Sequence, residues 1–523
     1  MEAISHEKLS SNSFLAVLLI TILMIIIIII IVQTKKSRTS KPTTRPPPPG
    51  PWRLPVIGNL HQLAANGGRS LPHRRLAELA KRYGPDVMLL QLGELSHVII
   101  STPEAARLVM KTHDLTFASR PSLLAVDILF SRNDVAFAPY GEHWRQMRKI
   151  CTLELFSAKR VGSFRWIREQ EVANLVTTLR TAAHQDEPVV DLTDLVQKLL
   201  GSVTSWATFG TIRGSNEMFL KVAKKFEDVV AGFRISDLYP SLTFLPVLTG
   251  FEGKLKKMRL EADSILDAII DERRSQRSSR SGRDGEVGDY LLDVLLNLHE
   301  NPSQLGFPLT MEAIKAVTLE LFLAGIETSA KIIEWTMSEM IKHPKVMQKA
   351  QEEVREAFGE KGDIEEASLH RLKYLDSIIK ESLRLHPPGP LLLPRENGES
   401  VELRGYHVPA KTKVFVNAWA INRDPRYWPE AEEFYPERFN DRMIDYRGND
   451  FQFIPFGAGR RMCPGYDFGV EVVKLTLANL IFHFQWKLPG EMRPESLDMT
   501  ERFGASVGRE YALRVIPVPY HGN

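Results

Sequence analysis

Cys463 is one of only two cysteines in the 523-residue chain, and it stands in the segment FGAGRRMCPG, residues 456–465. Three glycines and two arginines surround it, and an apolar helix pattern begins at Phe468. Backbone N–H groups, the positive end of a helix and guanidinium groups all favour a thiolate, so we expect a lowered pKa for this cysteine. The thiolate is the form of cysteine that attacks electrophiles or binds a metal. The segment therefore predicts a reactive or metal-bound sulfur.

The residues around this sulfur restrict the kind of metal. No other cysteine and no H-x-x-H pattern accompanies Cys463, which argues against a zinc site. A single thiolate on iron, inside a macrocycle that carries carboxylates, would use both the lone cysteine and the arginines. The other cysteine, Cys151, has helix neighbours of ordinary core type and is expected to be an inert buried thiol.

A second candidate for chemistry, the pair Glu327 and Thr328, lies inside an unusually apolar helix pattern over residues 310–342. Ala324, Gly325 and Thr328 share one face of this helix, and an acid and a hydroxyl in such surroundings need partners. Two interpretations stay open from the residues alone. Either the threonine bonds back to its own helix and the glutamate forms an internal ion pair, or the helix lines a groove that passes protons to a small polar molecule.

The segment KESLRLHPPGP places Glu381 three residues before Arg384 on a short helix that the His-Pro-Pro sequence ends. This spacing suits an ion pair within the helix, and the apolar neighbours predict partial burial. We interpret the pair as part of a structural network rather than as a catalytic acid. Arg438, in the segment FYPERF, is a further arginine outside any helix pattern.

Two other motifs are rejected on their context. GASVG, residues 504–508, fits the G-x-S-x-G pattern of serine hydrolases, but too little chain follows it to return an acid and a histidine to the serine. Gly457 and Gly459 begin a dinucleotide-like pattern whose third glycine is replaced by Met462, so no nicotinamide binding by this chain is expected.

Composition excludes several classes of protein. The chain has 67 Lys and Arg residues against 64 Asp and Glu, a formal net charge of +3, which does not indicate a partner nucleic acid. Two cysteines cannot form a disulfide framework for a chain of this length, so most of it is not expected in an oxidising compartment.

The N-terminal segment predicts a membrane anchor. Residues 14–32 are apolar except for one threonine, and this segment is long enough to span a bilayer as a helix. A cluster of basic residues follows the apolar segment, whereas in a cleaved signal peptide the basic residues precede it. The positive-inside rule then puts residues 1–13 in the lumen and keeps Lys35 and the residues after it in the cytosol. Residues 33–60 are expected to form a basic, proline-rich hinge, and residues 61–523 the globular domain.

Helix patterns dominate the remainder of the chain, so we predict a mainly α fold with a smaller β region. A β-hairpin is predicted over residues 87–101, and residues 273–288, rich in serine and arginine, are predicted to form a surface loop. The clearest helix patterns cover residues 71–84, 165–180, 195–209, 254–274 and 344–358.

Together these motifs resemble the cytochrome P450 superfamily of haem-thiolate monooxygenases, over essentially the whole chain. The family's patterns are F-x-x-G-x-R-x-C-x-G for the cysteine loop, A/G-G-x-D/E-T-T/S for the oxygen-binding helix, E-x-x-R, P-E-R-F, W-x-x-x-R, and a proline-rich hinge ending in G-N. The matching residues are Phe456, Gly459, Arg461, Cys463 and Gly465; Ala324, Gly325, Glu327, Thr328 and Ser329; Glu381 and Arg384; Arg438; Trp144 and Arg148; and residues 48–59.

The resemblance implies haem b as the cofactor, with Cys463 as the proximal ligand of its iron. It places Phe456 and Gly459 in the loop that binds the cofactor, and it implies that Thr328 and Glu327 assist protonation and cleavage of bound dioxygen. The residues implied to contact the haem propionates are Arg461, Trp144, Arg148 and Arg395, with Arg120 as a further candidate. Tyr466 and Asp467 depart from the small or apolar residues common in the family after the loop.

The resemblance also implies partners and a substrate class. Electrons would come from a separate NADPH-cytochrome P450 reductase that docks near Arg460, with cytochrome b5 as a further partner, at the endoplasmic reticulum membrane. The chain is most similar to plant members that oxidise terpenoids, so we expect hydroxylation or epoxidation of a small hydrophobic metabolite. The alternatives are an alkaloid or phenolic oxidase, an enzyme that rearranges its substrate without dioxygen, and a non-enzymatic membrane-anchored redox or docking protein.

The family's substrate contacts map onto mainly apolar segments, as a hydrophobic substrate requires. Two acids within them, Asp127 and Asp237, could pair with a cationic alkaloid or could be solvated. The segments are residues 123–137, 237–245, 391–393 and 503–507.

Overall fold

The computed structural model describes residues 45–64, 71–185, 188–210, 215–230, 233–280, 290–304, 307–359, 364–440 and 443–520. The predicted lumenal segment, the predicted anchor and the basic part of the hinge fall within residues 1–44 and lie outside these ranges. Among the described helices, none has both the length and the apolar composition needed to cross a membrane. The described part of the hinge reaches the sheet region, where Gly58 bridges to Leu92.

Helices make up most of the described chain, as the patterns predict. They are α2 (Leu60–Leu63), α3 (Pro72–Tyr83), α4 (Pro103–Arg107), α5 (Leu124–Phe130), α6 (Glu142–Ile150), α7 (Ala158–Ser163), α8 (Arg165–Ala183), α9 (Leu192–Phe209), α10 (Ser215–Val230), α11 (Ile235–Leu238), α12 (Leu245–Leu248), α13 (Phe251–Arg280), α14 (Leu291–Glu300), α15 (Met311–Lys342), α16 (Pro344–Phe358), α17 (Lys373–Leu385), α18 (Ala418–Ile421) and α19 (Tyr466–His483).

The strands are short and form small sheets. One sheet has the order β1-β2-β7-β4, a second the order β3-β11-β8, and the pairs β5-β6 and β9-β10 complete the set within the described ranges. Their bounds are β1 (Val87–Leu92), β2 (Leu95–Ile100), β3 (Val190–Asp191), β4 (Arg395–Glu396), β5 (Val401–Leu403), β6 (Tyr406–Val408), β7 (Lys413–Val416), β8 (Phe484–Lys487), β9 (Glu501–Arg502), β10 (Gly508–Arg509) and β11 (Arg514–Pro519).

Most of the local predictions are confirmed. The hairpin over residues 87–101 is the antiparallel pair β1-β2, with Val87 opposite Ile100 and Leu92 opposite Leu95. The loop predicted over residues 273–288 is wrong for its first part, because α13 continues to Arg280. The physical reason is a buried ion pair, in which Arg273 Nη2 lies 2.5 Å from Asp293 Oδ2. It holds the arginine-rich end of α13 against α14.

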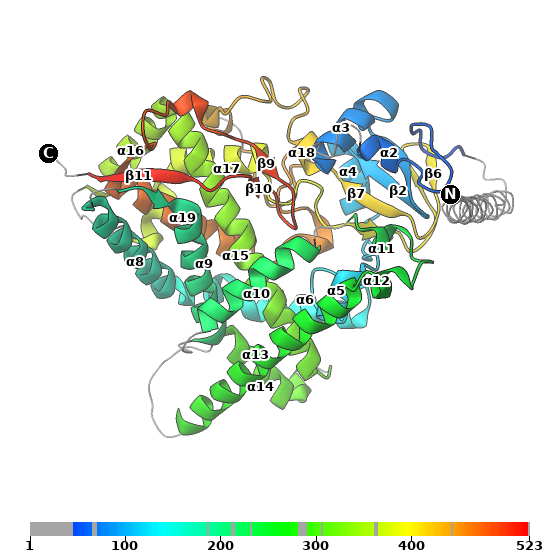
Figure 1. The fold of residues 1–523 in the computed structure, drawn as a ribbon, viewed down its shortest axis with the longest axis horizontal. Helices are drawn as coiled ribbons and strands as arrows, with labels where there is room; N and C mark the ends of the chain where they lie inside the picture. The colour runs from blue at the N-terminus through cyan, green and yellow to red at the C-terminus, as the bar shows by residue number, and fades with distance from the viewer. Residues whose placement is uncertain are drawn as a thin grey trace, which may run out of the picture.

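The long apolar helix α15 is the centre of the fold. The side chain of its predicted N-cap, Thr310, accepts a hydrogen bond from Ala313 N–H at 3.2 Å, and His343 ends the helix. It packs against α9, α17 and α19, and most of its length is buried. Figure 1 shows α8, α9, α16 and α19 on one side of α15, and α3 with strands β2 and β7 on the other.

The predicted network at Glu381 is present and fully buried. The Glu381 carboxylate accepts hydrogen bonds from Arg384 Nε at 2.7 Å and Nη2 at 2.8 Å, and from Arg438 Nε at 2.9 Å. The backbone N–H of Tyr435 adds a fourth at 2.9 Å. Because one carboxylate serves two guanidinium groups inside the protein, we assign it to the structure and not to the reaction. It fixes α17 to the segment that precedes the cysteine loop.

Candidate active site

The cysteine loop is held in shape by glycines and by its own backbone. Gly459 has φ of +68°, and a Cβ atom there would lie 2.0 Å from Met110 O, so only glycine fits. Cys463 N–H donates to Phe456 O at 3.0 Å, which closes the loop just before α19 begins. Cys463 is half-buried, whereas Cys151 is fully buried.

The expectation of a lowered thiol pKa is wrong for the protein chain alone. Burial raises the pKa of Cys463, and the opposing effects of the Gly465 N–H and the Arg148 guanidinium are smaller. Arg460 and Arg461, whose charges the sequence suggested would act on the sulfur, are not among these influences. A bound cation at the sulfur would remove the proton outright, so the thiolate depends on a metal more than on the loop.

Three arginines predicted to contact propionates lie together, deeply buried. Arg120, Arg395 and Arg461 are 4%, 3% and 8% exposed, respectively. Burial lowers the pKa of Arg461 to about 9 and that of Arg395 to about 10, and it lowers the pKa of Arg120 well below its usual value. In Arg120 and Arg461 the neighbouring guanidinium groups act in the same direction.

These guanidinium groups donate mainly to backbone carbonyls. Arg461 donates to Ala118 O at 2.7 Å and to Ala138 O at 2.6 Å, and Arg395 Nη1 lies 3.6 Å from the carboxylate of Asp114. Asp114 also pairs with the half-exposed Arg460 at 2.8 Å. A buried cluster of like charges is costly unless an anion joins it. The cluster is therefore suited to bind a ligand with more than one carboxylate.

Helix α6 brings Trp144 and Arg148, four residues apart, to the same cluster. Trp144 Nε1 donates to Val135 O at 2.9 Å, and the Arg461 guanidinium stacks over the Trp144 ring at 4.0 Å. Arg148 is half-buried, and within the described part of the chain no group accepts a hydrogen bond from its guanidinium. It is thus a cation close to Cys463 that is available for an anion.

The Glu327-Thr328 segment lies where α15 becomes accessible. Ala324 and Thr328 are exposed although the helix around them is largely buried, and Thr328 Oγ1 donates to Ala324 O at 2.8 Å. Gly325 faces α9, since a Cβ atom there would lie 3.4 Å from Thr204 Oγ1. The predicted hydrogen bond from the threonine hydroxyl to its own helix is therefore confirmed. Ala324 and Thr328 form the accessible face of α15, whereas Gly325 packs against α9.

Glu327 has a partner that sequence reasoning missed. Ser506 Oγ donates to Glu327 Oε2 at 2.7 Å, and Ser506 is only 4% exposed. The loop that carries it is fixed by Val507 N–H, which donates to Pro388 O at 2.9 Å. Ser506 is the serine of the rejected GASVG pattern. Ser506 also falls within residues 503–507, which the family's substrate contacts marked, but nothing in the sequence links it to Glu327 on α15.

The helix that follows the cysteine loop packs on α15 next to this segment. A Cβ atom on Gly469 of α19 would lie 3.3 Å from Ser329 Oγ, so the two helices approach closely at that point. The two residues that depart from the family's pattern also have partners. Tyr466 packs against Phe456 with ring centroids 6.1 Å apart, and Asp467 lies 3.8 Å from Arg447.

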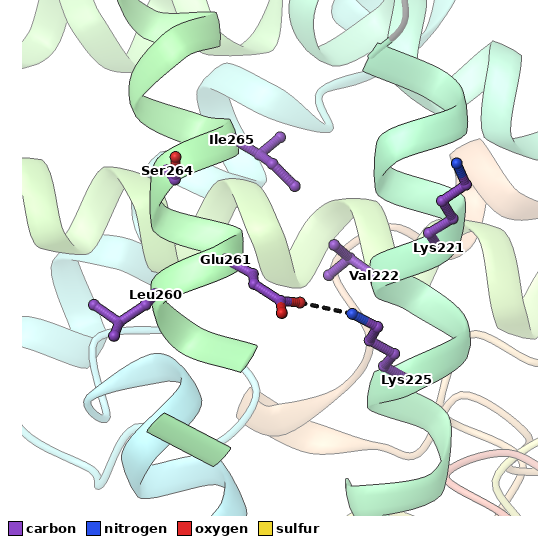
Figure 2. A pocket seen from close by; sticks show the side chains of 7 residues that line it. All are labelled: Lys221, Val222, Lys225, Leu260, Glu261, Ser264 and Ile265. Carbon is purple, nitrogen blue, oxygen red and sulfur yellow. Dashed lines mark hydrogen bonds and ion pairs between the residues drawn. The ribbon is translucent and has the colours of Figure 1, made fainter. Parts of the chain in front are cut away.

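An open groove lies elsewhere on the surface, between α10 and α13 (Figure 2). Val222, Leu260 and Ile265 give it apolar walls, and an ion pair of 2.6 Å joins Lys225 Nζ to Glu261 Oε2. None of the residues that line it has a predicted role in the reaction, so we assign the chemistry to the cysteine loop and α15.

Comparison with known proteins decides the family. The family model described as cytochrome P450 matches residues 47–510. The chain belongs to the cytochrome P450 family. Salviol synthase of Salvia pomifera is 48% identical to this P450 over 469 residues, which cover 90% of this chain and 91% of that protein. Premnaspirodiene oxygenase of Hyoscyamus muticus is 46% identical over 472 residues, with 90% and 92% covered.

Two further comparisons agree. The 5-epiaristolochene 1,3-dihydroxylase of Nicotiana tabacum is 45% identical over 473 residues, which cover 90% of this chain and 92% of that protein. A solved structure of a zebra fish cytochrome P450 with abiraterone superimposes with a TM-score of 0.72 at 25% identity, and it covers 86% of this chain and 100% of that chain. The mainly α fold with a smaller β region is therefore the P450 fold.

Membership makes this P450 a monooxygenase with haem b and a cysteine thiolate as axial ligand. The residues of this structure fit that cofactor. A half-buried cysteine supplies the sulfur, the buried guanidinium cluster with Arg148 suits two propionates, and α15 presents an accessible face at Ala324 and Thr328. Haem bound to a thiolate supplies the activation of dioxygen.

Proposed function

We propose that this P450 inserts one oxygen atom into a small neutral terpenoid, by hydroxylation or epoxidation, with electrons from NADPH through a separate reductase. The observation that carries the substrate class is the set of relatives at 45–48% identity, which includes a salviol synthase, a premnaspirodiene oxygenase and a 5-epiaristolochene dihydroxylase. The names premnaspirodiene and 5-epiaristolochene end as those of unsaturated hydrocarbons do, and a hydrocarbon carries no charge.

The two acids that could have held a cationic alkaloid support a neutral substrate. Asp237 is 8% exposed, its carboxylate accepts a hydrogen bond from Leu124 N–H at 2.8 Å, and the buried Lys413 donates to its backbone oxygen at 3.3 Å. Asp127 lies 3.7 Å from Arg132 and also accepts from the Ser122 hydroxyl. A carboxylate that already has such partners gains little from a ligand ammonium group.

The test is reconstitution of the full chain with a plant NADPH-cytochrome P450 reductase and a panel of terpene hydrocarbons, alkaloids and simple phenols. The ferrous carbon monoxide complex should first show the strongly red-shifted Soret band of a thiolate-bound haem. We expect mass spectrometry to find a product heavier by one oxygen atom from a terpene, and none when the reductase is left out. Turnover of alkaloids or phenols alone would overturn the substrate class.

We assign roles at the site on the same basis. Cys463 is the axial ligand, and Arg120, Arg148, Arg395, Arg461 and Trp144 hold the propionates. Glu327 is an acid whose carboxylate is held by Ser506, and the neighbouring Thr328 has a hydroxyl that can both accept and donate a proton. The pair can move protons from the Ser506 side of α15 to its accessible face.

Thr328→Ala should uncouple electron consumption from product formation. Without the hydroxyl, the proton from the Glu327 side must arrive through water alone, so we expect product per NADPH to fall by about tenfold while hydrogen peroxide rises. NADPH oxidation, peroxide and product are measured together. Thr328→Ser keeps the hydroxyl and serves as the control. If Thr328→Ala couples as well as wild type, the proton-delivery role is wrong.

We propose that the catalytic domain rests on the cytosolic face of the endoplasmic reticulum membrane, below the predicted anchor. Exposed apolar side chains support this on two neighbouring parts of the chain: Trp52 on the hinge is 63% exposed, and Val247 and Leu248 on α12 are 62% and 75% exposed. Tyr239 connects the two parts, because its hydroxyl donates to Val56 O at 3.4 Å. Large apolar side chains gathered on one face indicate a membrane or protein contact.

An environment-sensitive dye on Leu248→Cys tests this placement. In full-length protein incorporated into endoplasmic-reticulum-like vesicles, its emission should shift to the blue, because the side chain enters the interface. The matched control is Glu352→Cys, an exposed position on α16, which lies on the opposite side of the molecule from α12 (Figure 1). Equal emission from the two labels would refute the proposed orientation.

A further inference from the structure

The acid Glu320 lies on α15, one helical turn before Ala324, and binds the backbone of a distant loop. Its Oε2 accepts a hydrogen bond from Val135 N–H at 2.7 Å, and its Oε1 accepts one from Ala136 N–H at 2.8 Å. Each oxygen of the Glu320 carboxyl group therefore accepts a hydrogen bond from one of two consecutive backbone N–H groups. Burial raises the pKa of Glu320 to about 8, and the two backbone N–H groups oppose that rise.

The backbone carbonyls of the same loop accept hydrogen bonds from Trp144 and from two arginines of the buried guanidinium cluster. Val135 O accepts from Trp144 Nε1 at 2.9 Å and from Arg461 Nη1 at 3.2 Å. Ala136 O accepts from Arg120 Nε at 2.8 Å. The peptide group between Val135 and Ala136 is thus bonded at both ends, with its N–H on Glu320 and its carbonyl on Trp144 and Arg461.

The Val135-Ala136 peptide therefore links Glu320 to Arg461, although the two side chains form no hydrogen bond to each other. An acceptor oxygen bonded to the N–H end of a peptide polarises that peptide, so the peptide carbonyl becomes a better acceptor for the guanidinium on the other side. Asp134, next in the chain, is fully buried and accepts from Phe137 N–H at 3.1 Å through Oδ1, so it shapes the same loop. Glu320 is the member of this group that ties the loop to α15.

We propose that Glu320 is a positioning residue for the cofactor, which orients Arg461, Arg120 and Trp144 toward the haem propionates through the Val135-Ala136 peptide. This rests on the proposed role of those three side chains at the propionates. Because Glu320 belongs to the helix that also carries Glu327 and Thr328, it fixes the distance between the propionate end of the site and the proton-delivery segment.

Glu320→Gln is the variant that tests this. A glutamine keeps one oxygen acceptor but turns an NH₂ donor toward the second backbone N–H, so one of the two bonds is lost. Two quantities are measured on the full-length holoprotein. One is hydrogen exchange of the peptide that contains Val135 and Ala136, and the other is the rate at which haem transfers to excess apomyoglobin. Glu334→Gln is the control.

The control is matched in helix and in burial. Glu334 lies on the same α15, is 5% exposed, and accepts a hydrogen bond from Thr193 Oγ1 at 2.5 Å, away from the arginine cluster. Its replacement should destabilise the protein without affecting the cofactor. For Glu320→Gln we expect amide exchange in the 135–136 peptide and haem loss each to be faster by about tenfold or more, with a larger fraction of the inactive, less red-shifted carbon monoxide complex.

The possible results separate the alternatives. Faster amide exchange with wild-type haem loss would show a clamp that is purely structural, and it would overturn the proposal, as would no change in either quantity. Equal haem loss from Glu320→Gln and Glu334→Gln would also overturn it. If Glu320→Gln does not fold, Glu320→Asp is used, which keeps the carboxyl group but is too short to reach both donors and should show the same two effects. A wild-type chain that binds no haem would refute the proposed function instead, while amide exchange would still report the clamp.

Discussion

Cys463→Ala should abolish the red-shifted Soret band of the ferrous carbon monoxide complex and reduce product formation to background. The half-buried sulfur of Cys463 is placed at the start of α19 by a loop in which Gly459 and the Cys463-to-Phe456 hydrogen bond fix the backbone. Alanine removes the thiol of Cys463 and leaves the loop geometry intact, because the backbone bonds do not involve the side chain. The loss is therefore expected in the spectrum and the activity more than in the fold.

The second cysteine gives the matched control. Cys151 is fully buried, burial raises the pKa of its thiol above the usual range, and it lies just after α6 in the core. Cys151→Ala should cost about 1 kcal/mol of unfolding free energy through the small cavity and leave the spectrum unchanged. Spectra and turnover of the two variants are compared at equal protein concentration. Equal losses in the two would contradict the assignment of Cys463 as the ligand.

Short-range features of the sequence predicted much of the structure. The hairpin β1-β2, the N-cap of α15 and the ion pair of Glu381 with Arg384 each depend on residues a few positions apart, whose geometry is fixed by strand or helix spacing. For residues distant in the chain, such as Trp144 and Arg461, only the family resemblance predicts that they lie at the same site. The structure places the Arg461 guanidinium over the Trp144 ring, which gives that pairing a physical basis.

What the sequence could not predict depends on long-range contacts and on burial. The hydrogen bond from Ser506 to Glu327 joins residues 179 positions apart. The bonds that Glu320 accepts from the backbone of Val135 and Ala136 span 185 and 184 positions. No local sequence pattern encodes such distant partners. The thiol pKa of Cys463 was predicted in the wrong direction, since residue types show nearby N–H groups and arginines but not how much water the fold excludes.

Loss of the Glu381 carboxylate should have the largest effect on stability. The buried side chains of Arg384 and Arg438 together donate three hydrogen bonds to the Glu381 carboxylate. Glu381→Gln removes the negative charge that balances these two guanidinium groups. Breaking a buried ion pair by removing one partner costs about 3–5 kcal/mol. A domain is stable by only about 5–15 kcal/mol, so we expect a large fall in Tm and little haem-loaded protein. Both are measured, by thermal unfolding and by the ratio of haem to protein.

A surface pair with the same spacing separates burial from helix geometry. Arg75 and Glu78 also stand three residues apart on a helix, with Nη1 and Oε2 2.7 Å apart, but the Glu78 side chain is 60% exposed. Glu78→Gln should therefore cost only about 0–1 kcal/mol, because water solvates both charges once they separate. If the two glutamine variants lower Tm equally, the Glu381 network is not the buried structural element that its contacts indicate. If Glu381→Gln stays stable and haem-loaded but turns over no substrate, the carboxylate acts in the reaction after all.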